Sequence, residues 1–194
     1  MPEQTNYFLV IEGLDGSGKT ELSRRLAATL QQRLGEHQVL LTHEPHEAAC
    51  AGPFLREALG RRVRPVSNWT LALAFAANRS DHTTRFIDPF LAAGDRRVGI
   101  CDRYYLSSLV YQSEAQAEME TVMEINKAAR RPDLILFLNA SNEVCYARMD
   151  QREKNPEMFE DQIEQLRERY FAAIAYLRSR GGNIVEINAD PDIS

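Results

Sequence analysis

Near the start of the chain, a glycine-rich stretch has the residue types and spacing of a phosphate-binding loop. Gly13, Gly18, Lys19 and Thr20 fit the pattern G-x-x-x-x-G-K-[ST]. In this pattern the glycines let backbone N–H groups turn towards phosphates, the lysine reaches the terminal phosphates and the hydroxyl holds Mg²⁺. An apolar run at 8–11 precedes the loop and leucines at helical spacing follow it, which an accidental solvent turn would lack. We expect a nucleotide's phosphates to be bound by Gly13, Asp15, Gly16, Ser17, Gly18, Lys19 and Thr20.

Charged residues follow each of the first three apolar runs of the sequence. Glu12 and Asp15 follow the first run, the segment 43–45 (His-Glu-Pro) follows the second, and 102–104 (Asp-Arg-Tyr) follows the third. The carboxyl ends of parallel strands share one edge of a sheet, and ligands bind over that edge. These side chains are therefore expected to project into one cleft.

A sheet covered by helices is the architecture that would place these residues together. Apolar runs alternate with helical patterns, which predicts an α/β protein with the P-loop NTPase fold: a five-stranded parallel sheet with helices on both faces. Strands are expected at 8–11, 39–42, 98–101, 134–138 and 184–187. Helices are expected after Thr20, at 53–59, from Ser67 through Arg79 to Ala93 with an interruption near Asp81, from Ser107, around Met119 and Asn126, and after Ser141.

Composition and charge narrow the class of protein. The chain has 194 residues, 44% of them apolar and 26% charged, and without an internal repeat or a linker it is expected to form one domain over 1–194. The net charge of -5 argues against a nucleic-acid binder, which normally carries a basic face. Neither a signal peptide nor a membrane span is predicted, and three widely spaced cysteines suit reduced thiols, so we expect a cytoplasmic protein without a membrane partner.

The chain does not carry the guanine-reading signature of a GTPase. Such a protein should show N-K-x-D, whereas Asn126 and Lys127 are followed by two alanines. We interpret this pair as an exposed helix turn. The charged strand ends fit a kinase that acts on a small molecule better.

Taken together, the motifs resemble the thymidylate kinase family of nucleoside monophosphate kinases over nearly the whole chain. They are IEGLDGSGKT at 11–20, THEP at 42–45, LAFAANRSDH at 73–82, CDRYYLSSLVYQ at 101–112 and RPDLILFLNA at 131–140. The segments 75–79 and 102–112 are the specific ones, because a P-loop alone marks only the superfamily. The resemblance implies transfer of the γ-phosphoryl group of ATP to dTMP, giving dTDP, with Mg²⁺ as cofactor.

The resemblance also assigns the residues that bind the acceptor. Phe75 would stack on the thymine ring, and Arg79, one helical turn further on the same face, would reach the base or its phosphate side. Asp15 would hold the 3′-hydroxyl, Ser108 the base edge, and Tyr111 would crowd the position of a ribose 2′-hydroxyl. Without the resemblance, Phe75 would be interpreted as a core aromatic. The expected substrate-binding residues are Asp15, Glu44, Phe75, Arg79, Arg103, Ser108, Tyr111 and Gln112.

Phosphoryl transfer to a phosphate needs cations more than it needs a base. The second pKa of a phosphate monoester is about 6, so the acceptor oxygen is largely deprotonated at neutral pH. By the same resemblance, Lys19 and Arg103 would act on the donor and acceptor phosphates, while Asp102 and Thr20 would hold Mg²⁺ and its waters. The alternative for Asp102 and Arg103 is a structural ion pair at a strand end.

A further cation is expected from a lid at about 148–160. The variable positions of the phosphate loop carry no arginine, which resembles the subgroup of the family whose lid supplies the catalytic arginine. Arg148 and Arg152 are spaced i and i+4 and would project from one helix face, with Lys154 nearby. We expect Arg152 to be the catalytic residue, with Arg148 as the second candidate. The alternative for either arginine is a solvated charged helix.

Two histidines depart from the family's pattern. His43 and His46 stand where the family more often has arginine and glycine beside the Glu-Pro pair, so a phosphate contact expected there is missing or moved to Arg56. The histidines are three residues apart rather than four, which excludes a zinc-binding H-E-x-x-H motif. We interpret them as polar loop residues.

The sequence also allows other activities. A deoxynucleoside kinase would have to activate a neutral 5′-hydroxyl and so needs a carboxylate base, for which Glu44 is the candidate. Another deoxynucleoside monophosphate kinase, or a nucleotide-binding regulatory module without transfer activity, would share the phosphate loop. The resemblance further implies a homodimer, and the apolar helices between Leu106 and Met123 supply either its contact face or the core.

Overall fold

The computed structural model describes residues 6–113, 116–150 and 163–191. At its centre lies a parallel sheet with the strand order β2-β3-β1-β4-β5. The strands are β1 (Tyr7–Gly13), β2 (Val39–His43), β3 (Val98–Asp102), β4 (Leu134–Asn139) and β5 (Ile184–Asn188). The strands expected from the sequence are confirmed, with ends that differ by one or two residues.

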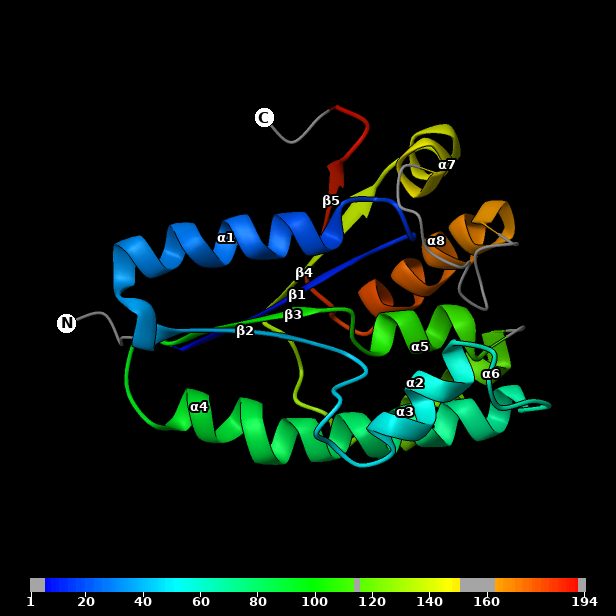
Figure 1. The fold of residues 1–194 in the computed structure, drawn as a ribbon, viewed down its shortest axis with the longest axis horizontal. Helices are drawn as coiled ribbons and strands as arrows, with labels where there is room; N and C mark the ends of the chain where they lie inside the picture. The colour runs from blue at the N-terminus through cyan, green and yellow to red at the C-terminus, as the bar shows by residue number, and fades with distance from the viewer. Residues whose placement is uncertain (1–5, 114–115, 151–162, 192–194) are drawn as a thin grey trace.

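Helices cover both faces of the sheet, as the sequence predicts (Figure 1). α1 (Lys19–Leu34) lies along one face, while α3 (Asn68–His82), α4 (Asp88–Ala92) and α5 (Tyr105–Tyr111) lie on the other. α8 (Ile163–Ser179) packs against α5. The other helical elements of the described residues are a 3₁₀ turn at Glu36–Gln38, α2 (Gly52–Leu59), a π-helical segment at Thr83–Ile87, α6 (Gln116–Ile125) and α7 (Asn142–Asp150).

The central strand β1 is buried on both faces. Its Phe8, Val10 and Ile11 are fully buried, and the neighbouring strands contribute the equally buried Ile100 and Phe137. A strand covered on both sides needs an unbroken apolar run rather than an alternating one, and this is what the sequence at 8–11 supplies. The loop that follows β1 is therefore attached to a closely packed support.

The helix interruption expected near Asp81 is not present. α3 runs past this position into a π-helical segment, Thr83–Ile87, which leads directly into α4. Pro89 has no N–H to bond the carbonyl four residues earlier, which suits a wider turn at this point. The expected N-cap of α3 is confirmed, because Ser67 Oγ accepts a hydrogen bond from the backbone N–H of Thr70 at 3.0 Å.

Backbone hydrogen bonds beyond the strands join the carboxyl ends of β1, β2 and β3. The N–H of Arg103 donates to the carbonyl of Ile11 at 2.9 Å, and the N–H of Glu44 donates to the carbonyl of Asp102 at 3.0 Å. The charged segments that follow these strands consequently meet at one edge of the sheet, as the sequence predicts.

Candidate active site

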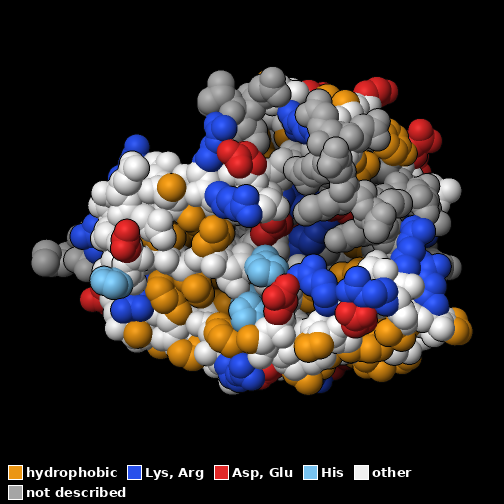
Figure 2. All heavy atoms as spheres, in the orientation of Figure 1, with side chains coloured by type: hydrophobic (Ala, Val, Ile, Leu, Met, Phe, Trp, Pro, Cys, Tyr) orange, Lys and Arg blue, Asp and Glu red, His pale blue; other side chains and the backbone are white. Residues whose placement is uncertain are grey.

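A cavity of about 710 Å³ opens at this edge of the sheet. Histidine, basic and acidic side chains gather near the middle of the face shown in Figure 2. Most of the expected site residues line the cavity: Asp15, Gly16, Gly18, Lys19, Thr20, Glu44, Phe75, Arg79, Asp102, Arg103, Ser108, Tyr111 and Gln112. Of the expected residues within the described ranges, Gly13, Ser17 and Arg148 are not among the lining residues.

Glycines shape the loop between β1 and α1. Gly13, Gly16 and Gly18 have φ values of 152°, 81° and 95°, which residues with a side chain rarely adopt. A Cβ atom on Gly16 would lie 2.4 Å from the carbonyl oxygen of Cys145, so the loop packs directly against α7. The N-cap of α1 is Gly18, which offers no side-chain cap. The N–H groups of the first helical turn therefore suit an anionic ligand.

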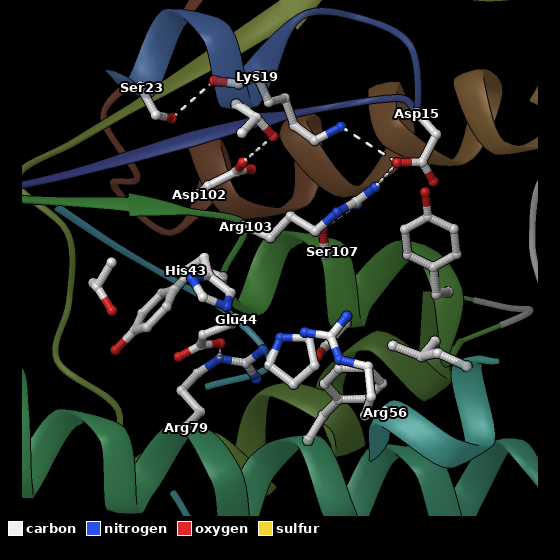
Figure 3. A pocket seen from close by; sticks show the side chains of 18 of the residues that line it. Asp15, Lys19, Ser23, His43, Glu44, Arg56, Arg79, Asp102, Arg103 and Ser107 are labelled. Atoms are coloured by element: carbon white, nitrogen blue, oxygen red, sulfur yellow. Dashed lines mark hydrogen bonds and ion pairs between the residues drawn. The ribbon is translucent and has the colours of Figure 1, made fainter. Parts of the chain in front are cut away.

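Lys19 lies within this loop and faces the cavity. Its Nζ donates to the carbonyl of Leu14 at 2.6 Å and lies 3.6 Å from Oδ1 of Asp15 (Figure 3). Burial and the charge of Arg103 lower the pKa of Lys19, while Asp15 opposes this shift. A bound phosphate would favour the charged ammonium form, which is the form that stabilises phosphate oxygens.

Thr20 and Asp102 form a pair with the chemistry of a Mg²⁺ site. The Thr20 hydroxyl donates to Asp102 Oδ2 at 2.7 Å. The other carboxylate oxygen, Asp102 Oδ1, is buried and has no hydrogen-bond partner within the described part of the chain. A hydroxyl and a carboxylate beside a phosphate loop are ligand types that Mg²⁺ uses, so these residues fit the metal.

Arg103 reaches from the end of β3 to the phosphate loop. The residue has a φ of 68°, and its Nη2 donates to Asp15 Oδ1 while its Nη1 donates to Ser107 Oγ at 3.0 Å. The guanidinium carbon lies 5.5 Å from the centre of the Tyr111 ring. Burial alone would raise the pKa of Asp15, but the charges of Arg103 and Lys19 outweigh it and lower this pKa to about 2.

Arg79 and Glu44 form a buried ion pair in the cavity wall. Arg79 Nε donates to Glu44 Oε2 at 2.7 Å, and the guanidinium lies 5.2 Å from the centre of the Tyr104 ring. The second oxygen of Glu44 lies 3.2 Å from His82 Nδ1. Both oxygens of this carboxylate are therefore engaged by buried partners, which is unlike a base that must accept a substrate proton.

Asn126 is buried, in contrast to the exposed helix turn expected from the sequence. Its side chain is 4% exposed, its Oδ1 accepts a hydrogen bond from Arg79 Nη1, and its Nδ2 donates to the carbonyl of Val122 at 2.7 Å. The interpretation as an exposed helix turn is wrong for Asn126. It holds for Lys127, whose side chain is exposed and pairs with Glu124.

Phe75 belongs to both the cavity and a small hydrophobic cluster. Its half-buried ring lines the cavity and packs against buried residues of α2 and α3 that include Leu55 and Leu71. The ring therefore both packs in a hydrophobic cluster and borders the cavity, while its stacking on a base stays a prediction. Ser108 and Gln112 are buried and also line the cavity, and Gln112 Oε1 has no hydrogen-bond partner within the described ranges.

Arg148 does not line the cavity, unlike most of the other expected site residues. Its Nη1 donates to the carbonyl of Ala189 at 2.9 Å, just beyond β5. Met149, which was not predicted, lines the cavity instead. Arg152 and Lys154 lie outside the described residues, so the catalytic arginine of the 148–160 segment stays a prediction.

The histidines after β2 have different environments. His43 lines the cavity, as does Arg56, the expected alternative phosphate contact. His46 instead stacks with His82 and Phe86, with ring centroids 4.4 Å and 4.3 Å away. Burial and the neighbouring histidines lower the pKa of His46, which favours the neutral ring. His46 is thus a packing residue rather than only a polar loop residue.

Glu12 lies beneath the cavity rather than in it, although the sequence places it among the cleft residues. The side chain is fully buried, and its Oε1 accepts hydrogen bonds from the backbone N–H groups of Tyr104 at 2.7 Å and Ser107 at 3.1 Å. Oε2 accepts a further bond from Ser107 Oγ at 2.7 Å. Burial raises the pKa of Glu12 against the pull of Arg103 and these bonds. Glu12 therefore anchors the segment that carries Arg103.

Glu44, His82 and Cys101 also place their possible ligand atoms within 4.8 Å of one another. A cation there would compete with the guanidinium of Arg79, which already occupies one oxygen of Glu44. Burial raises the pKa of the Cys101 thiol well above its usual value, so the metal-binding thiolate is disfavoured. We interpret this cluster as a structural network.

Comparisons with known proteins agree with the motifs. The family model for thymidylate kinase matches residues 11–194. A thymidylate kinase of Ruegeria pomeroyi is 36% identical over 194 residues, which cover 97% of this chain and 90% of the relative. One of Xanthomonas oryzae pv. oryzae is 34% identical over 186 residues, covering 95% and 77%.

Among solved structures, thymidylate kinase from Ehrlichia chaffeensis has the same fold. It superposes with a TM-score of 0.71 at 24% identity and covers 95% of this chain and 91% of that one. In the described part of the chain, every helix is too short or too polar to span a membrane.

The low pKa of Asp15 predicts a pH-dependent contribution to stability. The carboxylate stabilises the fold above its ordinary pKa of 3.8, and this contribution is lost as the pH falls towards about 2. Asp15→Asn should therefore lower the melting temperature at neutral pH, and its difference from the wild type should shrink below pH 4. Thermal unfolding followed by circular dichroism at a series of pH values measures this difference. A difference that stays constant from pH 7 to pH 3 would contradict the assignment.

Proposed function

The chain belongs to the thymidylate kinase family, and from this premise we propose that its cavity transfers the γ-phosphoryl group of ATP to dTMP, giving dTDP. The observation that carries the proposal is the position of Asp15. This carboxylate contacts Lys19 of the phosphate loop and Arg103 of the segment after β3. One cavity thus combines a loop for donor phosphates with a second cation, as a reaction between two phosphates requires.

The proposed reaction depends on cations rather than on a base. The phosphate of dTMP, with a second pKa of about 6, is already a nucleophile at neutral pH. Backbone N–H groups of the loop and Lys19 would bind the donor, and Arg103 would bind the acceptor phosphate. Because Lys19 and Arg103 approach the same carboxylate, they would also reduce the repulsion between the two phosphates.

The state of Glu44 favours a monophosphate as the acceptor. A deoxynucleoside kinase would need a carboxylate free to take a proton from a 5′-hydroxyl. In this chain Glu44 is 5% exposed and is held by Arg79 and His82. Glu44 would then act on the substrate indirectly, by holding Arg79 in the cavity wall.

The other walls of the cavity fit a deoxynucleotide. We propose that Phe75 stacks on the base, with Arg79 and the amide of Gln112 beside its polar edge. Ser108 would contact the same edge, and the buried Tyr111 would exclude a 2′-hydroxyl. A regulatory module that only binds ATP would not need side chains that bind an acceptor nucleotide.

Mg²⁺ would be held by Thr20 and Asp102. Asp102 Oδ1 has no hydrogen-bond partner among the described residues, which supports this assignment, because a buried carboxylate oxygen without a hydrogen bond is costly unless a ligand completes it. When bound, the metal would neutralise charge on the donor phosphates. Thr20 and Asp102 contribute the fixed hydroxyl and carboxylate oxygens on the protein side.

A coupled assay of ADP release tests the proposed activity. With ATP as donor, dTMP should be turned over with the highest kcat/KM in a panel that also holds dUMP, dCMP and thymidine. Lys19→Ala should lower kcat by about 100-fold or more because it removes a charge that stabilises the transferring group. The variant should still bind dTMP in calorimetry. Turnover of thymidine but not dTMP would identify a deoxynucleoside kinase, and no turnover with any acceptor would favour a regulatory module.

The metal assignment is tested by titration with Mg²⁺. Asp102→Asn should raise the concentration needed for half-maximal activity by about tenfold or more, since it removes a negative charge from the site. Asp88→Asn is the matched control, because Asp88 lies away from the cavity and pairs with Arg130. Identical Mg²⁺ curves for wild type and Asp102→Asn would overturn the assignment.

We also propose a homodimer joined through α3. The apolar residues expected to form a contact face are buried in the chain's own core, namely Leu106, Leu109, Val110, Met119 and Val122. On α3, however, Trp69 and Leu73 are 47% and 45% exposed and are spaced one helical turn apart. A second copy of the chain would cover this apolar strip.

Trp69→Glu should convert the dimer to a monomer, because it places a charge in the proposed contact. Light scattering coupled to gel filtration measures the mass in solution. Tyr146→Glu, which changes a 41% exposed aromatic on α7, is the matched control. A dimer that survives Trp69→Glu, or a monomeric wild type, would refute the proposed contact.

A cytoplasmic location is also proposed. Cys50, Cys101 and Cys145 are free thiols, which suits a reducing compartment. Cell fractionation followed by immunodetection tests it, and recovery in the membrane or secreted fraction would refute it.

A further inference from the structure

Tyr170 of α8 does not line the cavity, but its hydroxyl lies between the phosphate loop and the segment that carries Arg103. The residue is fully buried. Its hydroxyl oxygen lies 3.1 Å from the carbonyl oxygen of Gly13 and 3.4 Å from Nη1 of Arg103. Ser107 Oγ and Glu12 Oε2 lie at 3.3 Å and 3.5 Å. One side chain from a distant helix thus approaches both the phosphate loop and the segment that carries Arg103.

The hydrogen-bonding capacity of these groups limits the bonds that Tyr170 can form, and the distances rank its acceptors. A phenol donates one hydrogen bond and accepts up to two. Arg103 Nη1 can only donate, and Ser107 Oγ already donates to Glu12 Oε2. Tyr170 therefore donates to the nearest acceptor, the Gly13 carbonyl, and accepts from Arg103. Burial raises the pKa of Tyr170 well above its usual value, which keeps the donated proton in place.

On the donor side, the hydrogen bond from Tyr170 to the Gly13 carbonyl fixes the first residue of the phosphate loop. Gly13 has a φ of 152°, and a Cβ atom at this position would lie 2.8 Å from the carbonyl oxygen of Leu138. The start of the loop is therefore confined between β4 and Tyr170. On the acceptor side, Arg103 is held at one end of its guanidinium by Asp15 and at the other by Ser107 and Tyr170.

We propose that Tyr170 is a positioning residue, whose hydroxyl fixes the phosphate loop and Arg103 relative to each other. The role rests on the proposed function, since it matters when Gly13 to Thr20 bind the donor and Arg103 binds the acceptor. Transfer between two phosphates is sensitive to small displacements of either one. The ring of Tyr170 serves packing separately, with its centroid 5.1 Å from that of Phe137.

Tyr170→Phe isolates the hydroxyl because it leaves the ring in place. The matched control is Tyr176→Phe on the same helix, where the 6% exposed side chain lies under Arg180 and away from the cavity. Steady-state kinetics gives kcat and both KM values. Calorimetry gives the Kd of dTMP and of a non-hydrolysable ATP analogue, each measured alone.

For Tyr170→Phe we expect kcat to fall about tenfold or more, as for the loss of a hydrogen bond to a charged group. Each substrate alone should still bind with a Kd within about twofold of the wild-type value, because Tyr170 is fully buried and does not line the cavity. Tyr176→Phe should retain the wild-type kcat. If Tyr170→Phe keeps the wild-type kcat, or loses affinity for each substrate in proportion to its loss of rate, the positioning role is wrong.

Hydrogen exchange measured by mass spectrometry gives a readout independent of turnover. In Tyr170→Phe, faster exchange should be confined to the peptides that contain Gly13 to Lys19 and Arg103 to Ser107. Unchanged exchange in both peptides would overturn the proposal even if the wild type phosphorylates dTMP. If the wild type transfers phosphate to no acceptor, the proposed function fails, while local exchange in these two peptides still decides whether Tyr170 joins them.

Discussion

Two phosphate-bearing molecules repel each other, and this cavity must hold both in a chain with a net charge of -5. The structure meets this constraint locally. Lys19 and Arg103 follow different strands and approach the same carboxylate, Asp15. Since the pKa of Asp15 is about 2, the carboxylate stays ionised and keeps the two cations in place before ligands arrive. Cations that are already positioned need no rearrangement when phosphate charge develops, which is the condition for effective electrostatic stabilisation.

Two buried glutamates, Glu12 and Glu44, hold the cationic side chains in position. Glu12 accepts three hydrogen bonds from the segment that carries Arg103, and Glu44 holds Arg79 against the Tyr104 ring. An isolated buried carboxylate is costly, whereas one with several partners also orders the segments that supply them. In this site the glutamates therefore hold neighbouring segments in place, and Lys19, Arg79 and Arg103 line the cavity.

The parts predicted well from the sequence are those set by neighbouring residues. The phosphate loop, the five strands and the Ser67 cap each depend on residues within a few positions of one another. The environments of Asn126 and Tyr170 depend instead on contacts with residues 47 positions away (Arg79) and 157 positions away (Gly13). No local pattern distinguishes a buried asparagine at a helix end from an exposed one. Arg148 lies in α7, but its partner beyond β5 is set by tertiary packing.

The π-helical segment at Thr83–Ile87 changes the direction in which the side chains that follow it point around the helix axis. A residue of an α-helix advances by about 100°, so Ile87 would lie about 80° around the axis from Arg79 if the helix were regular. The one extra residue of a π turn reduces this offset to about 20°. Arg79 is 1% exposed, and Ile87 and Leu91 are 0% and 2% exposed, so each lies on a buried side of the helical rod. The wider turn thus brings Arg79, which lines the cavity, and Ile87, which packs in the core, close to one line along a continuous rod.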